Sequence, residues 1–368
     1  MTIDVLRVHR VQMPLVRPFR TSFGTETVRD LLLVEAITSD GAVGWGECVT
    51  MHRPAYSSEF TDGALLVMRE HLVPALRGVD ADPFAVRAAM DEVAGHPMAK
   101  CAIQTAVLDA WLRTRGERLA DFLGATRTAV DCGVSVGIPS SIPALLDEVG
   151  GYVNAGYRRI KLKIEPGWDM EAVAAVRAAH PTIPLQVDAN QAYTRDDIEH
   201  LAGLDDFNLL LVEQPLHEDD WYGHVLLSQR ITTPVCLDES ILSADSARSA
   251  IEMGATTVIN IKPGRMGGYL QAREVLDVCV DSGIAAWCGG MLETGVGRAA
   301  NVAVAAMPGC TLPGDTSASD RYYATDVTEP FVLRDGQLDV PTGPGIGVAP
   351  IASLLDEVTV AREELRPA

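Results

Sequence analysis

Short apolar segments alternate with helical stretches over most of this chain, and no other feature of the sequence constrains the fold as strongly. Eight segments are predicted to be strands: Gly133–Ile138, Ile160–Ile164, Leu185–Asp188, Leu209–Glu213, Val235–Asp238, Val258–Lys262, Ala285–Cys288 and Thr311–Gly314. Helices between nearly all of them imply a parallel sheet. Eight such units favour an α/β fold of the closed (β/α)8 barrel type over a doubly wound sheet. Such barrels carry their chemistry at the C-terminal strand ends.

The two ends of the chain have a different pattern. Leu31–Thr38 and Ala42–Glu47 flank an Asp-Gly pair, which favours the tight turn of a hairpin. Helices are predicted over residues 57–77, 83–94, 98–114 and 351–365. The segment Phe331–Val340 contains a second Asp-Gly turn. We therefore predict an α+β capping domain (residues 1–130), a catalytic barrel (131–320) and a C-terminal segment (321–368) that returns to the cap.

The charge balance narrows the classes of function. Acidic residues outnumber basic ones by 50 to 30, which gives a formal net charge of −20. Such a field repels phosphate backbones and anionic lipids, so we expect no nucleic-acid or membrane partner. No apolar run approaches the ~18–20 residues that span a bilayer. The seven cysteines are an odd number without a CxxC pair, which indicates buried thiols in a reducing cytoplasm rather than a disulfide scaffold.

Three acidic residues end successive predicted strands. Asp188, Glu213 and Asp238 are each 25 residues apart, about one strand–helix unit, so their carboxylates should meet at the barrel mouth. Three buried like charges require a counter-ion. An all-oxygen ligand set with room for substrate suits Mg²⁺, or Mn²⁺ as a substitute. The alternative is that these acids cap helices or lie on the surface.

Three lysines flank these acids in the predicted barrel order. Lys161 and Lys163 are two residues apart and so share one face of a strand, and Lys262 ends a strand 24 residues after Asp238. Lys163 and Lys262 should therefore approach the mouth from opposite sides. A lysine beside a metal ion and other cations has a lowered pKa and can act as a base. The alternative is that the lysines only neutralise the acids.

These parts together suit removal of a proton α to a carboxylate. The charge that develops on the resulting enediolate is stabilised by a divalent ion. One lysine would remove the proton and the other would deliver a proton to the opposite face, so racemisation becomes feasible.

The chain resembles the enolase superfamily, in its muconate-lactonising-enzyme-like branch, where a KxK pair and a later lysine serve as bases. Several segments are similar to the N-succinylamino acid racemase / o-succinylbenzoate synthase family: Pro18–Gly24, Trp45–Cys48, Lys161–Asp169, Asn260–Gly268 and Cys288–Arg298. The resemblance covers essentially the whole chain and implies a modified TIM barrel closed by the loops of the cap. It also implies acid/base roles for Lys163 and Lys262 and metal binding by Asp188, Glu213 and Asp238.

Further residues are expected near the substrate. By resemblance these are Ser135, Lys161, Asn190, Gly289, Gly290 and Met291. Asp315 either contacts substrate or caps a helix, and Glu239 either supports Lys262 or the metal or is a surface acid. Phe19, Phe23, Met51 and Tyr56 lie in predicted lid loops and could form an apolar wall. The segment 295–300 fits G-x-G-x-x-A, but we interpret it as a helix N-terminus whose amides could meet an anionic carboxylate rather than as a dinucleotide site.

The leading hypothesis is a metal-dependent racemase of N-acylated, preferably N-succinylated, amino acids, active as a homo-oligomer. The sister hypothesis is o-succinylbenzoate synthase, and one site could serve both activities. A dipeptide epimerase is less favoured, because Cys288–Met291 lacks the Asp-x-Asp that the resemblance leads one to expect there. A barrel that only binds a ligand would not need two bases and three metal ligands.

Overall fold

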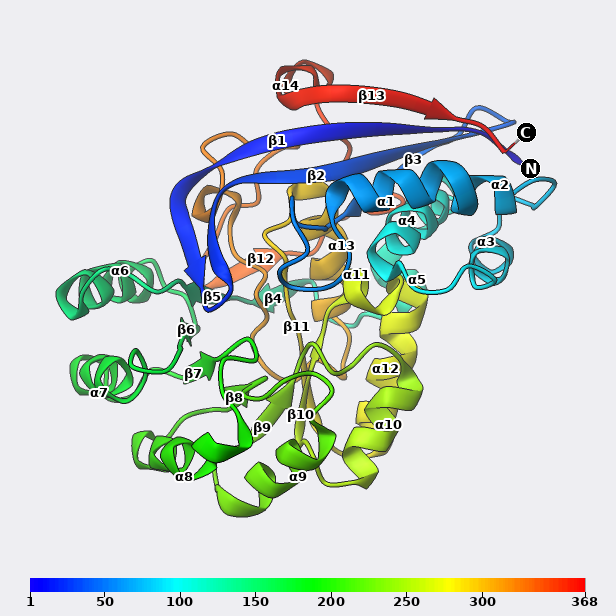
Figure 1. Ribbon diagram of the computed structural model, residues 1–368. Coiled ribbons are helices and arrows are strands. Elements are labelled where there is room, and N and C mark those ends of the chain that lie inside the picture. The colour runs from blue at the N-terminus through cyan, green and yellow to red at the C-terminus, as the bar shows by residue number, and fades with distance from the viewer. Residues whose placement is uncertain (368) are drawn as a thin grey trace.

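Seven of the eight predicted barrel strands form one parallel sheet in the computed structural model, which describes residues 1–367. The strands are β5 (Gly133–Val136), β6 (Arg159–Lys163), β7 (Leu185–Asp188), β8 (Val212–Glu213), β9 (Val235–Leu237), β10 (Val258–Ile261) and β11 (Ala285–Cys288). Their order in the sheet follows their order in the chain. The sheet is curled, with helices outside it (Figure 1), which is the architecture of a (β/α)8-type barrel.

Helices connect these strands on the outer side of the sheet (Figure 1). They are α6 (Ile142–Asn154), α7 (Met170–Ala179), α8 (Ile198–Leu201), α9 (Trp221–Arg230), α10 (Ala244–Glu252), α11 (Pro263–Met266), α12 (Tyr269–Asp281) and α13 (Gly295–Ala305). The short 3₁₀ helices are η2 (Arg195–Asp197), η3 (Ala202–Phe207) and η4 (Ser319–Arg321).

The eighth predicted strand, Thr311–Gly314, is not a regular strand. It closes the barrel through isolated contacts: the Gly133 amide donates to the Gly314 carbonyl at 2.7 Å, and the Thr311 amide donates to Ala286 at 2.8 Å. Pro313 within the segment has no amide hydrogen for a ladder, and its carbonyl accepts from the Arg159 guanidinium at 2.9 Å. The segment therefore bridges β11 and β5 without forming a full strand.

A four-stranded antiparallel sheet lies above the barrel mouth (Figure 1). Its order is β13 (Thr359–Leu365), β1 (Ile3–Thr21), β2 (Gly24–Thr38) and β3 (Val43–Cys48). The remaining cap elements are α1 (Thr61–Val67), the π-helical η1 (Met68–Leu72), α2 (Val73–Ala75), α3 (Pro83–Met90), α4 (Pro97–Arg113) and α5 (Leu119–Leu123). Helix α4 packs directly on β3, because a Cβ at Gly44 or Gly46 would lie about 2 Å from its backbone.

The C-terminal segment corrects one expectation. The helix predicted over 351–365 ends early: α14 covers Ala352–Val358, and residues 359–365 form β13, which pairs antiparallel with β1. Pairing with β13 satisfies the backbone N–H and C=O groups along the edge of β1, and the β-branched Thr359 and Val360 favour a strand. The predicted hairpin region contributes β12 (Gln337–Asp339), which pairs with β4 (Ala129–Asp131) rather than with the cap sheet. The tail thus contacts the cap through β13.

One buried apolar cluster joins the barrel to cap-sheet residues such as Val11 and Leu31, and a second lies in the cap. A third, small cluster comprises Leu211, Cys236, Val258 and Trp287. All seven cysteines are buried and none forms a disulfide. Within residues 1–367, no helix combines the length and the apolar character needed to cross a bilayer.

Candidate active site

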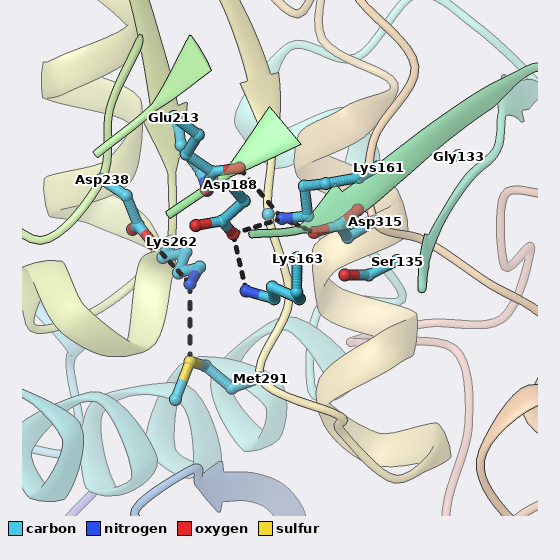
Figure 2. A network of polar contacts seen from close by, with 12 residues as sticks. Gly133, Ser135, Lys161, Lys163, Asp188, Glu213, Asp238, Lys262, Met291 and Asp315 are labelled. Atoms are coloured by element: carbon cyan, nitrogen blue, oxygen red, sulfur yellow. Dashed lines mark hydrogen bonds and ion pairs between the residues drawn. The ribbon is translucent and has the colours of Figure 1, made fainter. Parts of the chain in front are cut away.

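The parallel register brings the predicted chemical groups into one row. Lys163 on β6 lies beside Asp188 on β7, and Asp188 lies beside Glu213 on β8. Asp238 directly follows β9 and Lys262 directly follows β10. These five side chains are at most 8% exposed. In Figure 2, Lys163 contacts Asp188 and Lys262 contacts Asp238.

Lys161 lies at the centre of an ion-pair network. Its Nζ is 2.6 Å from Asp315 Oδ2, 3.0 Å from Glu213 Oε2 and 3.2 Å from Asp188 Oδ2. Asp315 also accepts from the buried guanidinium of Arg159 at 2.8 Å. Asp315 therefore neither caps a helix nor stands free for a substrate cation, because it is paired with two buried cations. Figure 2 shows its contact with Lys161.

Lys163 is held by an acid and an amide. Its Nζ donates to Asp188 Oδ2 at 2.6 Å and to Asn190 Oδ1 at 2.5 Å. Asn190 has a left-handed backbone (φ 42°), which asparagine tolerates better than most residues. Its Nδ2 donates to Glu239 Oε1 at 3.1 Å, and Glu239 is 1% exposed. Glu239 is thus a buried acid linked to Lys163 through Asn190, not a surface acid.

Lys262 is held by the barrel and by the cap together. Its Nζ donates to Asp238 Oδ2 at 2.7 Å and lies 3.3 Å from Tyr56 Oη and 3.6 Å from Met291 Sδ. The Tyr56 hydroxyl, which comes from the cap, is also 3.2 Å from Asp238 Oδ1. A lid residue therefore completes the surroundings of a barrel lysine.

The two flanking lysines differ in their electrostatics. Burial, reinforced by the charge of Lys161, lowers the pKa of Lys163, which favours the free amine of a base. Burial also acts to lower the pKa of Lys262, but nearby acidic groups, Tyr56 and Glu239 first, raise it above its ordinary value. Lys161 has a raised pKa as well, because Asp315 and Glu213 outweigh its burial. Lys161 therefore stays an ammonium.

The donor set fits a divalent ion chemically. Three carboxylates end successive strands in a buried site, and a further carboxylate oxygen, Glu239 Oε2, is buried without a hydrogen-bond partner. In the described residues 1–367, however, no three acidic, His or Cys side chains are gathered into a ready cage. Each predicted ligand is instead paired with a cation: Asp188 with Lys163, Glu213 with Lys161, and Asp238 with Lys262 and Arg265.

A small pocket, with a cavity volume of about 60 Å³, lies between the cap and these strand ends. All four predicted lid residues line it, namely Phe19, Phe23, Met51 and Tyr56. So do eight predicted barrel residues: Ser135, Lys161, Lys163, Asn190, Lys262, Gly290, Met291 and Asp315. The Ser135 hydroxyl is buried without a hydrogen-bond partner, which leaves it available to a ligand.

Gly289 has a different place from the one expected. It does not line the pocket, and a Cβ there would lie 2.1 Å from Asn260 Oδ1. Asn260 in turn donates to Glu213 Oε1 at 2.6 Å. Gly289 therefore makes room for the amide that holds a predicted metal ligand.

Sequence reasoning missed several residues of the site. Arg265 is 2% exposed and contacts both Asp238 and Tyr56; its position in the Asn260–Gly268 motif, just after a strand, was the available signal. Five further residues line the pocket: Thr21, Glu26, Arg29, Leu292 and Tyr322. They come from the hairpin and from loops, whose positions local patterns do not reveal.

Comparisons with known proteins agree with this geometry. Residues 2–124 match the mandelate racemase / muconate lactonizing enzyme N-terminal domain, and residues 144–353 match the enolase C-terminal domain-like family. The chain is 60% identical to an N-succinylamino acid racemase from Amycolatopsis sp (98% of this chain, 99% of the relative). It is 43% identical to an o-succinylbenzoate synthase from Geobacillus kaustophilus (94% and 92%).

A solved structure extends the match to three dimensions. An enolase-superfamily member from Listeria innocua superposes with a TM-score of 0.95 at 37% identity, covering 100% of both chains. With both domain models matched and the paired lysines and carboxylates at the barrel mouth, the chain belongs to the enolase superfamily, in the mandelate racemase / muconate lactonizing enzyme group.

Proposed function

We propose that this enzyme racemises N-acylated amino acids, with N-succinyl substrates preferred, by proton transfer between the substrate α-carbon and two lysines. The observation that carries the proposal is that Lys163 and Lys262 line one pocket and come from opposite ends of the row of strands β6 to β10. The 60% identity to an N-succinylamino acid racemase supports the same assignment.

The electrostatics divide the roles among the lysines. Lys163, whose pKa is lowered, removes the α-proton from one face of the substrate. Lys262 carries a proton and delivers it to the other face, and the roles reverse for the other enantiomer. Lys161 keeps its charge and attracts the substrate carboxylate. Asp188, Glu213 and Asp238 would hold Mg²⁺, which when bound supplies positive charge to that carboxylate as the proton leaves.

The acids that line the pocket favour an acylated amine. Glu26 is paired with Arg29 at 2.9 Å, and Asp315 is paired with Lys161 and Arg159. These acids are thus already neutralised, and the Cys288–Met291 strand end carries no acid. A free α-ammonium group would lack a counter-charge there, whereas the neutral nitrogen of an amide needs none. We therefore expect free amino acids to turn over far more slowly than their N-acyl forms.

The second candidate is o-succinylbenzoate synthase, which the 43% identity to such an enzyme favours. Dehydration would use the same Lys163 and the same carboxylates, so both activities fit one pocket. Neighbouring genes for menaquinone synthesis would favour the synthase as the physiological role.

The test separates the two lysines. Lys163→Ala and Lys262→Ala should each abolish racemisation, with losses of roughly 10²–10⁴ or more for the missing base. Each variant should still exchange the α-hydrogen of one enantiomer, and a different one, in deuterium oxide, as followed by proton NMR. By resemblance Lys163 serves the L substrate. Exchange without enantiomer preference in both variants would contradict the two-base mechanism.

A further inference from the structure

The N-terminus of helix α13 is occupied by the protein's own carboxylates. The amides there were expected to meet a substrate carboxylate, but Gly295 N donates to Asp326 Oδ1 at 2.8 Å. Thr294 N and Gly297 N donate to Glu47 at 3.1 and 2.9 Å. Two carboxylates of the chain thus satisfy the amides and the helix dipole.

Glu47 reaches this helix from the cap. It lies on β3, is 5% exposed, and also accepts from the Thr294 hydroxyl at 2.6 Å. A Cβ at Gly297 would lie 2.9 Å from Glu47 Oε2, so the glycine makes room for the carboxylate. The second glycine of the G-x-G-x-x-A motif therefore serves a contact between the two domains.

The turn just before this helix is strained and leads to the active site. Leu292 has φ 59°, a region that is costly for a residue with a bulky side chain. Glu293 Oε1 accepts from Met291 N at 2.8 Å, and the Tyr323 hydroxyl donates to the Leu292 carbonyl. Met291 Sδ lies 3.6 Å from Lys262 Nζ, as Figure 2 shows.

We propose that Glu47 is a positioning residue for Lys262: from the cap it fixes the start of α13, and thereby the strained 291–293 turn that places Met291 against the Lys262 amine. The catalytic part of this inference rests on the proposed two-lysine racemisation. Lys163 is held separately, by Asp188 and Asn190. The contribution of Glu47 should therefore be confined to one face of the substrate.

A matched control exists in the same domain. Glu59 is also a buried cap glutamate, 6% exposed, and it accepts from the amides of Met98 and Ala99 at the start of α4. These hydrogen bonds lie within the cap, and neither amide belongs to the 291–293 turn. Glu59→Gln thus reports what loss of a buried carboxylate at a helix start does to the fold alone.

The experiment compares Glu47→Gln, Glu59→Gln and wild type, each with Mg²⁺. The methyl resonance of Met291, labelled with ¹³C and assigned by Met291→Leu, should shift in Glu47→Gln and not in Glu59→Gln. The rate of α-hydrogen exchange for the enantiomer that Lys262 serves should fall by about tenfold or more. Tenfold corresponds to about 1.36 kcal/mol of activation free energy. Exchange of the other enantiomer should stay within about threefold.

Equal slowing of both enantiomers, or an unmoved Met291 resonance, would overturn the proposal. If Glu47→Gln does not fold, Thr294→Val should give the same one-sided pattern, and Thr294→Ser should restore wild-type behaviour because it keeps the hydroxyl. Exchange of neither enantiomer by wild type would overturn the proposed function, whereas a Met291 shift confined to Glu47→Gln would still support the link from cap to turn.

Discussion

The charged side chains of the barrel mouth form ion pairs and hydrogen bonds with one another, whereas the cap lines the same pocket largely with apolar side chains. Lys161, Asp188 and Glu213 are fully or almost fully buried and form a continuous network on neighbouring strands. Phe19, Phe23 and Met51 reach the pocket from the cap without such bonds. Under the proposed function, the chemistry falls to the sheet and the shape of the pocket to the cap.

The pKa values of buried acids in the two regions differ because their neighbouring groups differ. In the barrel, the cations beside Asp188 and Asp315 outweigh burial and hold the pKa of these carboxyls well below the usual range. In the cap, Glu59 accepts only backbone amides, and burial raises its pKa to about 7. A neighbouring cation does not always suffice, because Glu213, which lies beside Asp188 as well as Lys161, has a pKa that burial raises.

The largest effect should come from removing a predicted metal ligand. Asp238→Asn should weaken Mg²⁺ binding and lower turnover by roughly 10³-fold or more, because the charge developing on the substrate loses its stabilisation. Calorimetric titration with Mg²⁺ and α-hydrogen exchange measure the two effects. Asp219→Asn, at an acid that is 89% exposed, is the control. Full activity of metal-stripped protein in excess chelator would contradict the prediction.

Breaking the barrel network should cost stability. Lys161→Met leaves Asp188, Glu213 and Asp315 without their shared cation, so the free energy of unfolding should fall by about 3–5 kcal/mol. Denaturant titration without metal measures it. Arg334→Met removes an exposed ion pair and should cost less than about 1 kcal/mol. Equal losses in the two variants would show that burial does not distinguish these pairs.

The buried cap acid Glu59 should make the free energy of unfolding depend on pH. Wild type must ionise Glu59 in its buried site as pH rises from about 4.5 to about 7, so this group lowers stability across that window. Glu59→Gln lacks that loss and should gain up to about 3 kcal/mol relative to wild type between pH 5 and pH 8, at 1.36 kcal/mol per pKa unit. Denaturant unfolding of both proteins at the two pH values measures the gain. If the difference in unfolding free energy between the two proteins does not change with pH, the raised pKa of Glu59 is contradicted.

The smallest effect concerns the one lid residue bonded to the barrel network. Tyr56→Phe removes a hydroxyl between Asp238 and Lys262 and should lower kcat about five- to tenfold, as expected for one hydrogen bond. Phe23→Leu, which changes only pocket shape, should alter KM more than kcat. A fall beyond about 100-fold for Tyr56→Phe would place the cap in the chemistry and erase the division between the two regions.

Local pattern was enough to predict most of the barrel and its charged row. The 25-residue spacing of Asp188, Glu213 and Asp238 predicted neighbouring strand ends because each strand–helix unit has nearly constant length. The same reasoning wrongly predicted a regular strand around Pro313 and a helix over residues 359–365. At both places, strand formation depends on which strand edge is free to pair. Periodicity describes one segment at a time and carries no information about that edge.

Local polarity and spacing were enough to predict the order of the elements, the eight strand–helix units and the residue types at the strand ends. The pairing of the groups became visible only in the folded chain: Asp315 pairs with Lys161 and Arg159, Tyr56 with Lys262, and Glu47 with the start of α13. These partners are 154 to 250 residues apart in the sequence, far more than one strand–helix unit. Their meeting depends on how the cap sits on the barrel, because a hydrogen bond requires atoms within about 3 Å and no local pattern specifies that distance.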